Sequence, residues 1–117
     1  MKRSGSLFLY AALLAGNYLA QTVTGGLDGH VTDPAGGAIA NAQITAHDPV
    51  AGVERTTRTN EAGYFAMPFV PLGTYDVTVS MQGFATLTAK GNAVALNKTT
   101  TLNLVLQVSS VLLLFGS

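Results

Sequence analysis

Histidine and carboxylate side chains are the residues here that could bind a metal ion, because the 117-residue sequence contains no cysteine. A catalytic zinc site needs three protein ligands and one open position. The set that could be recruited is His30, His47 and Asp48. Residues 47 and 48 are adjacent at the end of an expected strand, where consecutive side chains point to opposite faces. Since there is also no His-x-x-Glu pair, the sequence disfavours a zinc enzyme.

Motifs for other kinds of chemistry are missing as well. Asp28 and Asp33 lie near the first expected turn and could offer oxygen ligands to calcium, but the EF-hand spacing is absent. The sequence has no Gly-x-Ser-x-Gly nucleophile elbow and no phosphate-binding glycine loop. We therefore predict a protein that is not an enzyme and that holds no cofactor and no metal.

Two aromatic residues are the candidates for ligand binding. Sugar sites combine exposed aromatic rings with polar groups. The sequence has no Trp, and Tyr75 and Phe65 are expected in the core, which leaves Tyr64 first and Phe84 second. If these two lie together on one surface, they favour a sugar platform. If both are buried, they favour an interaction or scaffold module of the cell envelope.

Charge excludes one class of partner. Lys2 and Arg3 belong to an expected export signal, and without them the chain has four basic and six acidic residues, a net charge of −2. The remaining cations are scattered rather than clustered. Such a chain offers no positive surface for nucleic acid.

The N-terminus has the order of features that defines a secretory signal peptide. A charged start is followed by an apolar run over residues 7–15 and by a small residue, Ala20. We expect residues 1–20 to be removed by cleavage between Ala20 and Gln21. The alternative is an uncleaved anchor, but the apolar run is short for a membrane span and Asn17 interrupts it. Export to the periplasm, free or associated with the outer membrane, is the expected location.

Alternating hydrophobicity and turn residues predict an all-β chain. The clearest strand places Tyr75, Val77, Val79 and Met81 on one face and polar residues on the other. Turns are expected wherever Pro, Gly, Asn and Asp cluster, as in residues 33–37. The seven expected strands are 27–32, 40–47, 53–59, 64–70, 74–81, 84–90 and 99–107.

Within the fourth strand the inward face is ambiguous. Either Tyr64 and Met67 or Phe65 and Phe69 are candidates for the core. Pro68 cannot donate a ladder hydrogen bond, so it predicts an edge strand or a bulge.

Seven short strands without a helical period indicate one seven-stranded β-sandwich of the prealbumin or immunoglobulin kind. We place it at residues 25–107, after a short leader at 21–26. Residues 108–117 form an apolar tail that either packs on the sandwich or marks a truncated chain, and we expect truncation. The strands at 53–59 and 84–90 are short and polar, so we expect them to be edges that could accept a partner strand.

This pattern resembles the carboxypeptidase regulatory-like domain family, whose fold is a prealbumin-like sandwich. The resemblance also extends to the version that precedes the plug and barrel of TonB-dependent outer-membrane receptors. It implies a partner in the cell envelope or a downstream receptor barrel. The residues that match the family pattern are Gly29, Val31, Asp33, Gly36, Ala42, Ile44, Thr59, Gly63, Phe65, Pro71, Gly73, Tyr75, Gly83 and Phe84.

The predicted function is that of an exported, non-catalytic interaction module, the N-terminal extension of such a receptor. The alternative is a carbohydrate-binding module with a starch-binding-like fold. The two differ in partner, a protein in the first case and a sugar in the second.

Overall fold

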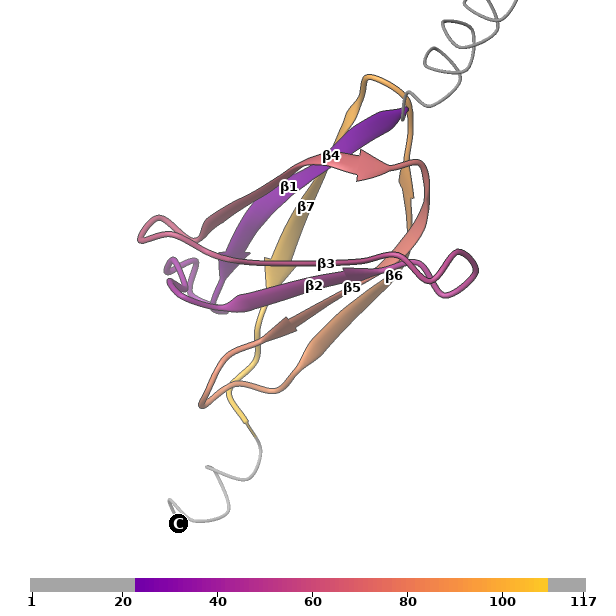
Figure 1. Ribbon diagram of the computed structural model, residues 1–117. Coiled ribbons are helices and arrows are strands. Elements are labelled where there is room, and N and C mark those ends of the chain that lie inside the picture. Colours follow the sequence, from indigo (N-terminus) through magenta and orange to yellow (C-terminus); the bar gives the residue numbers. More distant parts are fainter. Residues whose placement is uncertain (1–22, 110–117) are drawn as a thin grey trace, which may run out of the picture.

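Seven strands and no helix make up residues 23–109, which the computed structural model describes (Figure 1). The expected signal at 1–20 and the tail from residue 110 onward lie outside these residues. The all-β prediction and the number of strands are confirmed. The strands are β1 (Thr24–Thr32), β2 (Gln43–His47), β3 (Glu54–Arg58), β4 (Tyr64–Pro71), β5 (Gly73–Ser80), β6 (Leu87–Val94) and β7 (Thr99–Val105).

The strands form two facing sheets, as expected for a sandwich. A three-stranded sheet has the order β4-β1-β7, and a four-stranded sheet has the order β3-β2-β5-β6 (Figure 1). All neighbouring strands are antiparallel except β1 and β7, which run parallel. The edges are therefore β4 and β7 in one sheet and β3 and β6 in the other, which confirms both strands predicted as edges.

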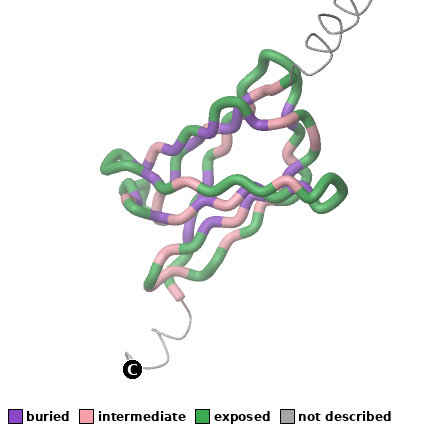
Figure 2. Tube along the Cα trace, in the orientation of Figure 1, coloured by how far each residue is buried: buried purple, intermediate pink, exposed green. Residues whose placement is uncertain are grey.

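The core lies between the sheets, and alternate side chains of β2 and β5 are buried in it (Figure 2). In β5 the expected alternation is confirmed, because Tyr75, Val77 and Val79 are buried. Met81 is only half-buried, since β5 ends at Ser80 and the chain turns there. Each buried aliphatic or aromatic side chain contributes about 1.5–3 kcal/mol, so this layer supplies the main stabilisation.

A bulge resolves the ambiguity in β4. Leu27 pairs with Met67 and Gly25 pairs with Val70, so two residues of β4 face the single residue between them on β1. The inserted pair is Pro68 and Phe69, and the side chains of Phe65, Met67 and Val70 are buried. Pro68 thus marks both an edge and a bulge, as predicted. The prediction of Phe69 as a core residue is wrong, because the bulge turns its side chain outward and leaves it 77% exposed.

Strand boundaries differ from the prediction at several places. β6 was expected at 84–90 but spans Leu87–Val94. The reason is that Phe84 bridges to Val108 and the Ala85 amide donates to the Gln107 carbonyl, so this stretch contacts the chain after β7 before β6 begins to pair with β5. β1 begins at Thr24 rather than Leu27, β2 begins later than expected, and β7 ends two residues earlier.

Polar side chains close the turns. The Asp33 carboxylate accepts hydrogen bonds from the Ala35 and Gly37 amides, at 3.0 and 2.7 Å. The buried Thr59 hydroxyl donates to the Ile39 carbonyl at 2.7 Å and accepts from the Ala42 amide at 2.9 Å. These bonds satisfy backbone groups that no strand partner reaches.

The hydroxyl of Tyr75 fastens the tight connection between β4 and β5. It donates to the Pro71 carbonyl at 2.7 Å, four residues upstream, while the ring is fully buried. This resembles the tyrosine corner of immunoglobulin-type sandwiches. Burial and the nearby Asp48 carboxylate raise the pKa of Tyr75 above its usual 10.0, partly offset by Arg55.

We expect Tyr75→Phe to lower the free energy of unfolding by about 1–2 kcal/mol, because the Pro71 carbonyl loses its partner. Urea denaturation at pH 7 measures this loss. Since the folded-state pKa is raised, the wild-type protein should keep its stability below about pH 10 and lose it as the pH rises further. Tyr75→Phe should flatten part of this alkaline loss, and an unchanged alkaline profile would show that Tyr75 is not its source.

Candidate functional site

The residues that match the family pattern serve the fold. Asp33 and Thr59 bond turn backbone, Tyr75 fixes a connection, and Phe65 packs in the core. The three surface hollows described below are lined entirely by other residues. The residues that line these hollows can therefore change without loss of the residues that hold the fold.

A shallow groove runs along the strands on the outer face of the three-stranded sheet. It consists of two adjoining hollows of about 200 and 160 Å³. They share Gly26, Pro68 and Thr99. The floor is low because Gly26 on β1 and Ala66 on β4 carry little or no side chain. We call this surface the β1–β4 groove.

A hydrogen-bonded aromatic residue forms one end of the β1–β4 groove. The Tyr64 hydroxyl donates to one oxygen of Asp28 at 3.2 Å, and the Thr101 hydroxyl donates to the other at 2.6 Å. The ring of His30 lies beside that of Tyr64, with centroids 5.2 Å apart and a tilted arrangement. Partial burial, followed by the hydrogen bond to Asp28 and its charge, raises the pKa of Tyr64 above 10.0. The Tyr64 side chain is therefore fixed by its hydrogen bond to Asp28 and stays protonated at neutral pH.

An exposed aromatic residue forms the other end. Phe69 stands on the bulge of β4 with a φ of 61°, in the left-handed region that a bulky residue rarely adopts. Asn97, with a φ of 54°, and Lys98 face it from the connection between β6 and β7 (top of Figure 1). Strained residues of this kind cluster at binding sites. The sequence prediction missed Phe69, although the neighbouring Pro68 already indicated the bulge.

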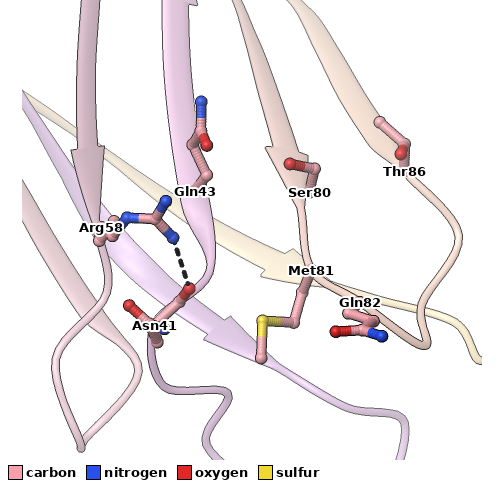
Figure 3. Close-up of a pocket in the computed structure, with 7 residues that line it drawn as sticks. All are labelled: Asn41, Gln43, Arg58, Ser80, Met81, Gln82 and Thr86. Carbon is pink, nitrogen blue, oxygen red and sulfur yellow. Dashed lines mark hydrogen bonds between the residues drawn. The ribbon is translucent and has the colours of Figure 1, made fainter.

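A separate pocket of about 470 Å³ lies over one end of the four-stranded sheet (Figure 3). We call it the Arg58 pocket. The Arg58 guanidinium donates a hydrogen bond to the Asn41 backbone carbonyl at 3.2 Å. Its walls are polar apart from one thioether, and its lining residues are Asn41, Gln43, Arg58, Ser80, Met81, Gln82 and Thr86.

The structure does not bring together the two predicted ligand-binding residues. Tyr64 is half-buried and lines the β1–β4 groove. Phe84 is half-buried in the connection between β5 and β6, where it packs against the core. Neither expected arrangement, a shared platform or joint burial, is therefore present, and only Tyr64 belongs to the groove.

The residues considered for metal binding are dispersed. His30 lies on β1 and His47 on β2, in different sheets, while Asp48 is buried and accepts hydrogen bonds from the Val50 and Ala51 amides. Asp28 and Asp33 are engaged separately, the former by hydroxyls and the latter by turn amides. Within residues 23–109 no group of three histidine or acidic residues is arranged to hold a metal ion. The same residues contain no helix long and apolar enough to span a membrane.

Solved structures of similar fold include dioxygenases and putative carbohydrate binding proteins. A 3-chlorocatechol 1,2-dioxygenase from Rhodococcus opacus 1CP has 15% identity and a TM-score of 0.59, with coverage of 76% of this chain and 61% of the dioxygenase. A putative carbohydrate binding protein from Bacteroides uniformis has 16% identity and a TM-score of 0.57, with coverage of 69% and 40%. Another from Pseudomonas aeruginosa has 17% identity and a TM-score of 0.53, with coverage of 75% and 93%.

At these identities the likeness concerns the fold alone. The chain spans less than two thirds of the dioxygenase, so the dioxygenase's activity does not transfer with the fold. A comparison with curated proteins gave no match. The sequence profile of the carboxypeptidase regulatory-like domain matches residues 26–107, which include all seven strands but for the start of β1, and this chain belongs to that family.

Proposed function

We propose that this chain is a non-catalytic binding module of the cell envelope that recognises a carbohydrate chain in the β1–β4 groove. The observation that carries the proposal is the groove itself, with Tyr64 at one end and the 77% exposed Phe69 at the other. An exposed aromatic side chain on a strained backbone has no packing role to explain it.

The chemistry along the groove suits a sugar. Aromatic rings at both ends can stack on the apolar faces of pyranose rings. Between and beside them lie hydrogen-bonding groups of several kinds, including the Asp28 carboxylate, the Asn97 amide and the Lys98 ammonium. Because the groove is open and runs along the strands, it suits an extended chain better than a single enclosed sugar. The two putative carbohydrate binding proteins of similar fold add support at the level of fold only.

Docking of a protein strand is a second candidate function. β3 is an edge strand without proline or bulge, whereas the edge strand β4 is interrupted by Pro68 and its bulge. A regular edge can accept an added strand through backbone hydrogen bonds. The binding module would then act as an accessory domain for an envelope protein.

The receptor context is part of the same proposal. The expected export signal at residues 1–20 and the resemblance to the leading domains of TonB-dependent receptors support a place ahead of a plug and barrel. Reading the DNA downstream of codon 117 tests it. A plug and barrel sequence there is the expected result, and unrelated sequence after a stop codon would contradict it.

Native gel electrophoresis in gels that contain soluble neutral polysaccharides tests the sugar proposal. We expect the wild-type protein to be retarded by at least one polysaccharide, and Tyr64→Ala to reduce the retardation several-fold. The control is Val50→Ala, because Val50 is 95% exposed in the connection between β2 and β3 and lines none of the hollows. Absence of retardation across the panel, or an equal effect of both variants, would count against the proposal.

A further inference from the structure

The Arg58 pocket is a second site, independent of the β1–β4 groove. We infer that it binds the carboxylate of an acidic sugar, with the guanidinium of Arg58 on the carboxylate and the surrounding amides and hydroxyls on the sugar hydroxyls. The two sites lie on the outer faces of different sheets and share no lining residue. The failure of one would leave the other untouched.

Strand register places the main polar groups of the pocket in one row. Gln43 pairs with Arg58 on one side and with Ser80 on the other. Paired residues on neighbouring strands project to the same face, about 5 Å apart. Figure 3 shows the guanidinium, the amide and the hydroxyl reaching from β3, β2 and the end of β5, with Thr86 beyond them.

The charge in the pocket is positive and unopposed by its walls. Arg58 is the only charged residue among the lining residues. On the same sheet face the acidic residues Glu54 and Asp76 are the cross-strand neighbours of His47, four residues along each strand from the row that contains Arg58. Four residues of strand correspond to about 13 Å, which exceeds the Debye length at physiological salt. An incoming carboxylate therefore meets a guanidinium in a pocket whose lining contains no acidic residue.

Arg58 keeps donors free for such a ligand. A guanidinium has five N–H donors in a planar fork, and one bond to the Asn41 carbonyl occupies only part of it. The fork matches a carboxylate in a bidentate manner, which lysine could not reproduce. The bond to Asn41 also limits how the long side chain can move, so less conformational entropy is lost on binding.

The other walls select for a sugar rather than a simple acid. The Asn41, Gln43 and Gln82 amides and the Ser80 and Thr86 hydroxyls offer both donors and acceptors, as sugar hydroxyls require. Met81 is the one apolar residue of the lining, half-buried and packed in part against the core. The volume of about 470 Å³ falls in the range of small-molecule sites.

Nuclear magnetic resonance titration of the full ¹⁵N-labelled chain tests the inference. The probes are galacturonate, galactose and acetate, which separate the sugar acid from the sugar alone and the carboxylate alone. We expect galacturonate to shift the Arg58 side-chain resonance and the Gln43 and Gln82 amides in a saturable manner. Arg58→Gln should weaken this binding at least fivefold, and galactose and acetate should each bind at least fivefold more weakly than galacturonate.

Arg55→Gln is the matched control. Arg55 lies on the same strand, and the same substitution removes the same charge, but Arg55 pairs with the inward-facing Ala46 and does not line the pocket. If galacturonate causes no chemical-shift changes, the proposed site is wrong. The same holds if Arg55→Gln weakens galacturonate binding as much as Arg58→Gln does. Binding of acetate or galactose as strong as that of galacturonate would overturn the assignment to an acidic sugar.

Discussion

Replacing Gly63 with alanine is expected to lower the free energy of unfolding by roughly 3 kcal/mol. Gly63 has a φ of 75°, which costs any residue with a Cβ about 1–2 kcal/mol. A Cβ there would also lie 2.6 Å from the Val31 carbonyl oxygen. That oxygen already accepts the Ile39 amide, and the Val31 amide donates to Gly63 itself. Relief of the collision would therefore disrupt the junction between β1 and the start of β4.

Gly52→Ala is the control that isolates the collision. Gly52 has the same φ of 75°, but a Cβ there would meet nothing within 4 Å. It should cost only about 1 kcal/mol, from the backbone conformation alone. Urea denaturation of both variants gives their free energies of unfolding. These can be compared if the two variants have equal m-values. Equal losses in the two variants would show that the contact with Val31 does not constrain the fold.

Replacing Phe69 with glycine is expected to weaken binding of the carbohydrate about thirtyfold while raising the stability of the protein. An aromatic side chain that anchors a ligand contributes about 2 kcal/mol or more to binding, which corresponds to this factor. Stability should rise by about 0.5–1 kcal/mol, because glycine adopts a φ of 61° without strain and the lost ring was 77% exposed. Affinity electrophoresis and thermal unfolding measure the two effects.

Phe69→Ala separates the ring from the strain. Alanine removes the ring but keeps a Cβ in the left-handed conformation, so binding should fall as in the glycine variant without the gain in stability. A glycine variant that binds like the wild-type protein would remove Phe69 from the site. A glycine variant that is strongly destabilised would show that Phe69 is a packing residue.

Much of the fold could be predicted because local patterns carry it. The strict alternation of Tyr75, Val77 and Val79 required one buried face, and the structure has it. The turn residues after β1, such as Asp33, also act where expected. These features depend on residues that are close in sequence, so one sequence is enough to predict them.

What failed depends on distant pairing. The inward face of β4 could not be chosen from sequence, because the bulge at Pro68 and Phe69 exists only relative to β1. The start of β6 was misplaced because Phe84 bridges to Val108, a residue distant in sequence that follows β7.

The two surface sites are consequences of register as well. The β1–β4 groove forms where the small residues Gly26 and Ala66 line the outer face of the sheet. The polar row of the Arg58 pocket forms because strand pairing aligns Gln43 with Arg58 and Ser80. Of the residues in the β1–β4 groove, only Tyr64 was selected from sequence, as the first candidate for an exposed aromatic side chain.

Amide chemical shifts of the full chain, titrated with a neutral oligosaccharide, map directly where the sugar binds. We expect the shifted amides to cluster at Gly26, Ala66 and Thr99, along the β1–β4 groove, and Phe69→Gly to abolish the shifts at the same ligand concentration. Shifts confined to other surfaces, or shifts that persist unchanged in Phe69→Gly, would contradict the proposed site.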